Sequence, residues 1–539
     1  MVEGHEVVSV KGAVAAGPKG AAQVGGRILE QGGNAMDAAA ATSLACAMME
    51  PQTNGIGGYM MAAVVLEGKT GRLWSLDSNA VSPAGTREDM YEILPKWEGV
   101  DAVNENEYDC SVADNANVYG PLAVAVPGQM AGMGMMAEKW GRLKWEEIVA
   151  PSQQLLEQGF AYGERLAGSI GSMERVLRRF EATAAHLMPE DKVPSAEDVW
   201  HRPDMEKTLA RLAAVGWRDF YEGEIGWKIA AALQEMGGVL TREDMANFAP
   251  RFSEPYAITY RDAQVYGPIL PNGCLSSLQI LQMLECFEPV ADDQVLYWHR
   301  LAEVLKLGWR DRLLYAGDPD FVEVPIERLL SKDYAAGRVE GVKQFPEWVD
   351  RSGWGLSSAS LPETLHLSTA DAEGNVVAAT ITQGGTFGSC VAVPGTGIIL
   401  GHGMCRLDPR PGRANSVAPG KRPLNNVAPI ILRTAERDVA IGLPGGRRII
   451  SVVPRMAQLM VDFGASAFEV ASAPRMHVTS EEPVEAQTTL DEDIVRGLEE
   501  MGHRIEPVAT VASAAHIAEY FKADGKIRAG GNTWAVGAE

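Results

Sequence analysis

The stretch TLHLSTADAEGNVVAATITQGGTFG, at residues 364–388, decides the fold. Polar and apolar side chains largely alternate along its first run, the second run is rich in β-branched residues, and Asp-Ala-Glu-Gly-Asn stands between the two runs. Alternation suits a strand with two different faces, and a glycine-containing turn allows the chain to reverse. The stretch therefore predicts a β-hairpin whose first strand begins at Thr364.

The residues around this hairpin predict a mixture of helices and strands. Asn34 and Asp37 precede and open the run AMDAAAATSLACAMM, which is typical of a capped helix over 35–49. A glycine turn after Pro51 leads into an apolar strand. Most of 130–310 has helical patterns, and 343–363 is rich in Gly, Ser and Pro and predicts an exposed connection. Further strands are expected near 390–401 and 438–443, and helices near 449–463 and 491–501.

Composition excludes several classes of protein. The chain has 539 residues, and 48 Lys plus Arg against 71 Asp plus Glu gives a net charge of −23. Such a charge opposes binding to nucleic acid or to an anionic membrane. We find neither a leader-like start nor about 18 consecutive apolar residues, so we expect a cytoplasmic protein that does not bind membranes.

Motifs for metals and cofactors are missing from the sequence. The six cysteines are scattered without CxxC spacing, which favours reduced thiols over a zinc site or a disulfide framework. The sequence has no P-loop, HExxH or EF-hand pattern. We therefore expect neither a metal nor a cofactor.

Thr364 is the candidate nucleophile, because it opens a strand directly after the predicted connection. A threonine hydroxyl needs a base, and its own α-amine, with a pKa of about 7.7–8.0, could serve once the bond between Glu363 and Thr364 is cut. The backbone amides of Gly445 and Gly446 could then stabilise an oxyanion. The alternatives are an ordinary strand threonine and a simple Pro-Gly-Gly turn.

Several segments in the right order resemble the γ-glutamyltransferases (glutathione hydrolases) of the N-terminal nucleophile hydrolase superfamily. They are AAQVGGRILEQGGNAMDAAAATSLACAMMEPQTNGIGG (21–58), AVAVPGQMAGM (123–133), LTREDMANF (240–248), WRDRLLYAGDPDFVEVP (309–325), the hairpin (364–388), KRPLNNVAPIIL (421–432) and LPGGRRII (443–450). The resemblance implies an α+β fold of the αββα four-layer sandwich type.

The resemblance also implies a precursor that cuts itself before Thr364. The products would be a large chain, 1–363, and a small chain of 539 − 363 = 176 residues, 364–539, intertwined in one unit. It further implies an acyl-enzyme on Thr364, with Thr382 near the new amine and Gly445 and Gly446 as the oxyanion-hole glycines. A homodimer of such pairs is one assembly that it leaves open.

The family's clamp for a glutamyl group is largely absent from this sequence. Its carboxylate-binding arginine aligns with Asn79, and its paired serines align with Asn425 and Asn426. Its asparagine in the hairpin segment aligns with Gly384, and its amine-binding glutamine aligns with Gly403. The sequence therefore predicts a substrate other than a standard γ-glutamyl compound.

A charge reversal points to the kind of substrate. The aspartate that holds the substrate α-amine in the family aligns with Arg406, and Arg447 follows the two glycines. An arginine repels an ammonium group and attracts a carboxylate. We therefore expect an amidohydrolase for a small amide whose acyl group has a carboxylate and no α-amine, read by Arg406 or Arg447. Either arginine could instead pair with one of the many acidic residues.

Two other functions stay open at this point. One is a conventional γ-glutamyl hydrolase or transpeptidase with a rearranged clamp, acting on glutathione-like substrates. The other is an unprocessed, catalytically silent binding protein. The presence of Thr364, Thr382, Gly445 and Gly446 together argues against the silent protein.

Overall fold

The computed structural model describes residues 1–95, 108, 110–290, 292–344 and 363–539. The predicted hairpin is present as β12 (Glu363–Asp371) and β13 (Val376–Gly384), which pair antiparallel from Leu365 opposite Ile381 to Ala370 opposite Val376. The register shifts between Glu363 and Leu365, which places Thr364 at a bulge in the pairing. Residues 345–362 of the predicted connection lie outside the described residues.

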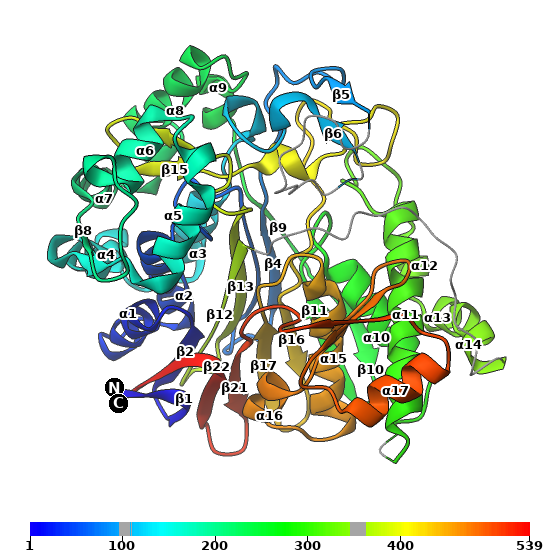
Figure 1. Cartoon of the computed structure of the whole chain (residues 1–539). Helices are drawn as coiled ribbons and strands as arrows, with labels where there is room; N and C mark the ends of the chain where they lie inside the picture. The colour runs from blue at the N-terminus through cyan, green and yellow to red at the C-terminus, as the bar shows by residue number, and fades with distance from the viewer. Residues whose placement is uncertain (96–107, 109, 291, 345–362) are drawn as a thin grey trace.

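One large sheet dominates the described chain and has 13 strands (Figure 1). Their order is β10-β11-β16-β17-β21-β22-β2-β12-β13-β3-β4-β9, with β1 also paired to β22. The strands besides the hairpin are β1 (Val2–Ser9), β2 (Gly12–Ala16), β3 (Met60–Leu66), β4 (Leu73–Ser78), β9 (Arg251–Ser253), β10 (Tyr256–Tyr260), β11 (Ala263–Gly267), β16 (Ile430–Arg433), β17 (Arg437–Gly442), β21 (His516–Phe521) and β22 (Ile527–Ala538).

The sheet folds back on itself into two layers. β12 contacts β21 and β13 contacts β17, although other strands separate each pair in the sheet order. Small and β-branched side chains fill the space between the layers, among them Ala15, Val64, Ala378, Ala440 and Ala518. Such small side chains let the two sheet layers approach closely. The two termini lie together at one edge, where β1 pairs with β22 (Figure 1).

Helices cover both outer faces of the folded sheet (Figure 1). One core lies between β2, β12, β13 and β3 and the helices α1 (Lys19–Glu30), α2 (Ala35–Met49), α3 (Gln129–Trp140) and α4 (Trp145–Gln158). The other lies between β11, β16 and β17 and the helices α10 (Cys274–Glu285), α11 (Gln294–Tyr315) and α15 (Arg448–Asp462). The four layers confirm the predicted α+β fold of αββα type.

The remaining described elements form the periphery. The prediction that 130–310 is mostly helical is incomplete, because β9, β10 and β11 lie within it. The peripheral helices are α5 (Gly163–Leu177), α6 (Glu181–Leu187), α7 (Pro203–Val215), α8 (Glu224–Glu235), α9 (Arg242–Ala246), α12 (Ile326–Leu329), α13 (Lys332–Arg338), α14 (Glu340–Gln344), α16 (Ala467–Ser472) and α17 (Glu492–Glu500). The peripheral strands are β5 (Ile93–Leu94), β6 (Ser111–Val112), β7 (Phe160–Ala161), β8 (Val199–Trp200), β14 (Val391–Val393), β15 (Ile398–Leu400), β18 (Met476–His477), β19 (Val484–Gln487) and β20 (Ile505–Val508).

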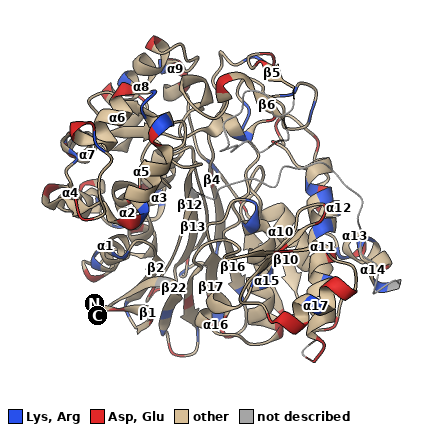
Figure 2. Ribbon diagram, in the orientation of Figure 1, with Lys and Arg blue, Asp and Glu red and all other residues tan. Residues whose placement is uncertain are grey.

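The charged side chains lie mainly on the outer helices and loops, whereas the central strands carry few of them (Figure 2). No helix among the described residues is long and apolar enough to cross a membrane. The cytoplasmic location inferred from the sequence stays a prediction.

Asp371 ties the hairpin turn to the helix layer. Its Oδ1 accepts hydrogen bonds from the backbone N–H groups of Glu373 at 2.9 Å and Asn375 at 3.2 Å. Its Oδ2 accepts from the Asn375 side chain at 2.8 Å and from the backbone N–H of Ala35, the first residue of α2, at 2.8 Å. Asn34 caps the same helix end through a capping box with Asp37, as predicted. One buried carboxylate thus fixes the turn and the helix together.

We expect Asp371→Ala to lower the free energy of unfolding by about 3 kcal/mol, because several buried donors lose their acceptor at once. Urea denaturation measures this loss. Glu373→Ala is the matched control in the same turn. Its ion pairs with Lys69 and Arg142 are on the surface, so it should cost less than about 1 kcal/mol. Equal losses for the two variants would contradict the role given to Asp371.

Candidate active site

Thr364 lies at the start of β12 and is 5% exposed. Its Oγ1 is 3.3 Å from Oγ1 of Thr382, to which it donates a hydrogen bond. Oγ1 of Thr382 also accepts a hydrogen bond of 2.9 Å from the backbone N–H of Gly384. The bulge sets this geometry, because Thr382 lies in the part of β13 that has no regular partner on β12. The two threonine hydroxyls therefore meet at one end of the hairpin.

A small cavity opens beside Thr364, with a volume of about 20 Å³. This is room for about one water molecule. Six residues singled out in the sequence line it: Thr364, Thr382, Gly384, Arg406, Asn426 and Gly446. They come from the hairpin, from the segments at 403–406 and 423–427 and from the turn before α15. The fold thus gathers these residues around the candidate nucleophile.

Gly446 stands on the cavity wall at the turn that starts α15. Its φ of +57° is a left-handed backbone conformation that favours glycine. The backbone N–H groups of Arg448 and Ile449 donate to the carbonyls of Gly445 at 3.1 Å and Gly446 at 3.2 Å, and the dipole of α15 makes this end of the helix electropositive. Gly445 is not among the lining residues, and a Cβ there would come within 2.5 Å of the Ala512 side chain. Gly446 is the glycine that lines the cavity, and the oxyanion-hole role of Gly445 stays a prediction.

Arg406 brings a positive charge to the cavity. Arg406 is 7% exposed, and its Nη2 donates a 2.8 Å hydrogen bond to the backbone carbonyl of Gly384. Gly384 has a φ of +103°, and a Cβ on it would lie 2.3 Å from Nε2 of His402. The imidazole thus fills the space that a side chain at 384 would need. Burial, followed by the charge of Arg406, lowers the pKa of His402 to about 3, so this imidazole is neutral.

The other predicted residues do not line the cavity. Asn425 donates to Oδ1 of Asn272 at 2.9 Å and accepts from the backbone N–H of Val427 at 3.0 Å. Asn79 donates to the carbonyl of Pro423 at 2.7 Å. Both asparagines therefore shape the segment that carries Asn426.

Two further predicted positions also lie away from the cavity. Arg447 is buried at the start of α15, where its charge contributes to lowering the pKa of His477 after the larger effects of burial and Arg448. Gly403 packs closely, since a Cβ there would lie 2.8 Å from the Ala125 side chain. Of the two candidate arginines, Arg406 is the one that lines the cavity beside Thr364.

Sequence reasoning missed three lining residues, Tyr59, Val427 and Ile449. Tyr59 directly follows the glycine turn at 57–58 and precedes β3. A large aromatic residue at that place in the sequence could have indicated a lining residue. Val427 and Ile449 look like ordinary core residues in the sequence, because only the tertiary fold brings them to the site. These three side chains make part of the cavity wall apolar, whereas Arg406 makes another part positively charged.

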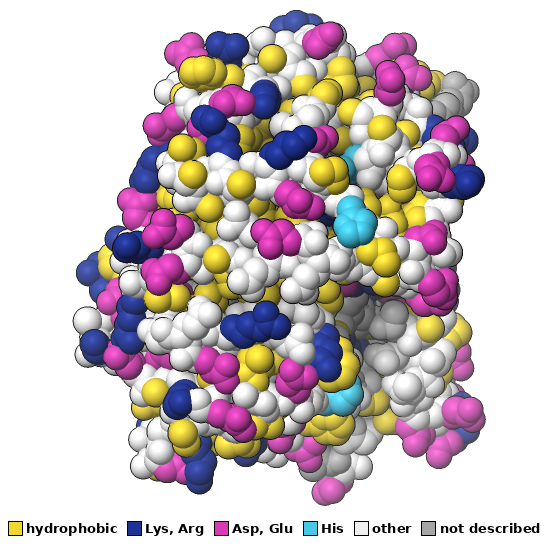
Figure 3. Space-filling view, turned by 90° about the vertical axis from the view of Figure 1, so that its left-hand side faces the viewer, with side chains coloured by type: hydrophobic (Ala, Val, Ile, Leu, Met, Phe, Trp, Pro, Cys, Tyr) yellow, Lys and Arg dark blue, Asp and Glu magenta, His cyan; other side chains and the backbone are white. Residues whose placement is uncertain are grey.

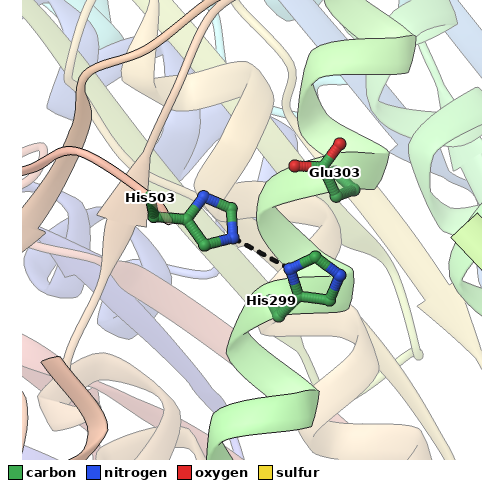
Figure 4. Close-up of side chains that lie close together, drawn as sticks. All are labelled: His299, Glu303 and His503. Atoms are coloured by element: carbon green, nitrogen blue, oxygen red, sulfur yellow. Dashed lines mark hydrogen bonds between the residues drawn. The ribbon is translucent and has the colours of Figure 1, made fainter. Parts of the chain in front are cut away.

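A second polar cluster lies away from this site, between α11 and the C-terminal segment (Figure 4). His299, Glu303 and His503 have ligand atoms within 4.8 Å of one another, a grouping that no motif in the sequence indicates. Nδ1 of His299 is 2.8 Å from Nε2 of His503, and Nζ of Lys306 lies 2.8 Å from Glu303 and 2.6 Å from Glu482. The lysine already neutralises the carboxylate that a metal ion would need. We therefore assign this cluster to holding α11 against the C-terminal segment.

Comparisons with known proteins agree with this geometry. The family model for gamma-glutamyltranspeptidase matches residues 21–539. The chain is 33% identical over 518 residues to the acylase ACY 1 proenzyme of Pseudomonas sp. strain SE83, covering 94% of this chain and 89% of that protein. It is 31% identical over 520 residues to the glutathione hydrolase proenzyme of Bacillus subtilis strain 168, covering 92% and 86%.

Solved structures show the same similarity. The cephalosporin acylase from Bacillus halodurans superposes with a TM-score of 0.87 at 28% identity, over 99% of this chain and 97% of that one. The γ-glutamyltranspeptidase of Helicobacter pylori superposes with a TM-score of 0.54 at 27% identity, over 60% of this chain and 90% of that one. These matches confirm the resemblance seen in the sequence. The chain belongs to the γ-glutamyltranspeptidase family.

Proposed function

We propose that the protein is a self-processing N-terminal threonine amidohydrolase whose acyl substrate has a carboxylate and no α-amine. The observation that carries this proposal is the guanidinium of Arg406 at the wall of the cavity that Thr364 lines. Family membership supports an enzyme of the amidohydrolase or transpeptidase kind, and two relatives are named as proenzymes.

Processing begins with the hydroxyl of Thr364. Its oxygen attacks the carbonyl carbon of Glu363, the peptide C–N bond breaks, and the nitrogen takes up a proton to become the α-amine of Thr364. Water then hydrolyses the resulting ester and releases the carboxylate of the new C-terminus. The bond lies at the bulge between Glu363 and Leu365, where regular sheet pairing is interrupted.

The two products, 1–363 and 364–539, stay together. β12 of the small chain pairs with β2 of the large chain, and β13 pairs with β3. The core that covers this sheet also draws on both segments. Cleavage before Thr364 breaks one peptide bond and leaves these contacts in place.

Turnover uses the groups that processing creates. The free α-amine of Thr364 takes the proton from its own hydroxyl, which attacks the carbonyl of the substrate amide. The negative charge on the tetrahedral oxygen is met by the backbone N–H of Gly446 and the electropositive start of α15. The amine leaves with a proton, and water or an acceptor amine then releases the acyl group from Thr364.

Arg406 selects the acyl group by charge. A carboxylate within hydrogen-bond distance of a poorly solvated guanidinium is attracted strongly, whereas an ammonium in the same place is repelled. Tyr59, Val427 and Ile449 line the same cavity and would favour the methylene part of the acyl group once the cavity, which has room for about one water molecule, widens to admit it. A ω-carboxyacyl group such as glutaryl matches this combination of one charge and an apolar chain.

The relatives supply a second candidate function. The similarity to a glutathione hydrolase proenzyme favours γ-glutamyl transfer, whereas the similarity to an acylase proenzyme favours a different acyl group. A γ-glutamyl group differs from glutaryl only by its α-ammonium. Arg406 at the cavity therefore favours the acylase-like function, and two substrates that differ in that one group can separate the candidates.

The purified wild-type protein should give two bands whose intact masses correspond to 1–363 and 364–539. Thr364→Ala should remain one chain of 539 residues with no turnover, because it has no hydroxyl to attack Glu363. Thr364→Ser keeps a hydroxyl and should still be cut. A single uncut wild-type chain would support the silent binding protein, and cleavage of the alanine variant would exclude Thr364 as the nucleophile.

Wild-type enzyme should hydrolyse glutaryl-p-nitroanilide at least about tenfold better in kcat/KM than γ-glutamyl-p-nitroanilide, because only the second places an ammonium beside Arg406. Arg406→Met should lower kcat/KM for the glutaryl anilide by about tenfold or more. Pentanoyl-p-nitroanilide has the same number of acyl carbons, with a methyl group in place of the carboxylate, and is the control, so its kcat/KM should change little. A preference for the γ-glutamyl anilide would favour the second candidate, and an equal loss on both acyl groups would remove Arg406 from substrate recognition.

A further inference from the structure

A second and much larger cavity lies in the peripheral helices, on the side of the molecule shown in Figure 3, where hydrophobic side chains are visible between charged ones. Its volume is about 1140 Å³, and it lies among α6, α7, α8 and β14. Trp200 and the strand Val391–Val393 form its buried part. This volume is large enough for a small organic molecule.

A buried positive charge stands behind this cavity. Arg202 is 2% exposed, and none of the carboxylates in the described part of the chain forms an ion pair with it. Burial lowers the pKa of Arg202 to about 9, so it remains charged at neutral pH. Its guanidinium donates to the carbonyls of Met48 at 2.7 Å and Gly397 at 3.2 Å, and its Nε has no described acceptor. A buried cation held only by neutral groups creates a site that attracts an anion.

His186 lies between this charge and the cavity. Its Nε2 lies 3.4 Å from Nη2 of Arg202, and because arginine can only donate, Nε2 must be the acceptor. Burial, followed by the charge of Arg202, lowers the pKa of His186 to about 3, so the ring is neutral and its one proton is on Nδ1. His186 lines the cavity, and no described residue accepts a hydrogen bond from Nδ1. The cavity wall therefore presents an N–H donor that the buried arginine polarises.

The rest of the wall suits a flat apolar body. The indole of Trp200 is 2% exposed, with the guanidinium of Arg202 4.4 Å from its ring centroid and the ring of Tyr162 stacked on it at 5.2 Å, so it supports the buried end of the cavity from behind. Phe180 and Met236 line the same space. Aromatic and sulfur-containing side chains pack well against a planar ligand.

The charged residues that line the cavity lie nearer to solvent. Glu181 and Glu235 are exposed, and Asp204 pairs with Lys207 at 3.2 Å. Exposed charges are screened by water and salt, whereas a charge in the low-dielectric interior acts more strongly at the same distance. The effect of Arg202 therefore dominates at the buried end of the cavity.

We propose that this cavity is a binding site for a small aromatic anion, whose carboxylate or sulfonate accepts a hydrogen bond from Nδ1 of His186 while its ring packs against Phe180 and Met236. This site is separate from Thr364, since none of its lining residues lines the small cavity beside the nucleophile. The inference does not depend on the proposed amidohydrolase activity, and its test measures binding alone.

The test uses two fluorescent probes with the same ring skeleton. 8-Anilinonaphthalene-1-sulfonate has an anionic group, and N-phenyl-1-naphthylamine does not. The folded wild-type protein should bind the sulfonate at one saturable site, at least about tenfold more tightly than the uncharged probe. His186→Phe keeps an aromatic wall but removes the donor, so it should weaken binding of the sulfonate by about tenfold and leave the uncharged probe nearly unchanged.

His201→Phe is the matched control, because His201 also lines the cavity but is exposed and is not hydrogen bonded to Arg202 in the described structure. It should leave both affinities unchanged. Met236→Glu and Met236→Gln replace the same side chain, which is 39% exposed, so both should fold normally, and only the glutamate should weaken the sulfonate relative to the uncharged probe. This pair of variants keeps the test decisive if His186→Phe fails to fold. Equal affinity for the two probes, or equal effects of the two histidine variants, would overturn the proposal.

Discussion

The pairing of β12 between two other strands is the constraint on which the site depends. Residues 367–371 pair with β2 on one side, and the strand pairs with β13 on the other. Thr364 is therefore fixed by a sheet in the middle of the molecule rather than by a loop, and Asp371 fixes the opposite end of the strand against α2. Residues on rigid elements hold reacting groups more precisely than residues on loops do. Every other group of the site is placed relative to this strand.

The groups around that strand differ in how specific they are for a substrate. In the proposed mechanism the threonine pair and Gly446 would suit any amide, because they would act on the reacting carbonyl and the attacking hydroxyl. In the proposed function Arg406 selects the acyl group, and its guanidinium is linked to Gly384 by the hydrogen bond to the backbone carbonyl. The imidazole of His402 leaves no room for a side chain at 384. A change of specificity at this site would therefore require several of these positions to change together.

Local sequence patterns predicted much of the fold and only part of the site. The hairpin and the capped helix at 35–49 were predictable because alternation and capping residues are local signals, and the four-layer arrangement was predictable because the sequence resembles a known family. The lining residues Val427 and Ile449 were not, because nothing local distinguishes them from core residues. The predicted residues Asn79 and Asn425 instead support the backbone nearby. Alignment with a family can identify the position that corresponds to a site residue, but the contacts of the residue at that position depend on how distant segments pack.

The meeting of the two chain ends has a consequence for how such a protein could be made. β1 and β22 lie side by side, and the amino group of Met1 is 3.2 Å from the side chain of Glu539. Chains whose ends lie close together often tolerate circular permutation. A short linker between these ends, with a new start in which Thr364 directly follows the initiator methionine, would give a single chain whose nucleophile becomes N-terminal when that methionine is removed. Catalysis could then be studied in a protein that never has to cut itself.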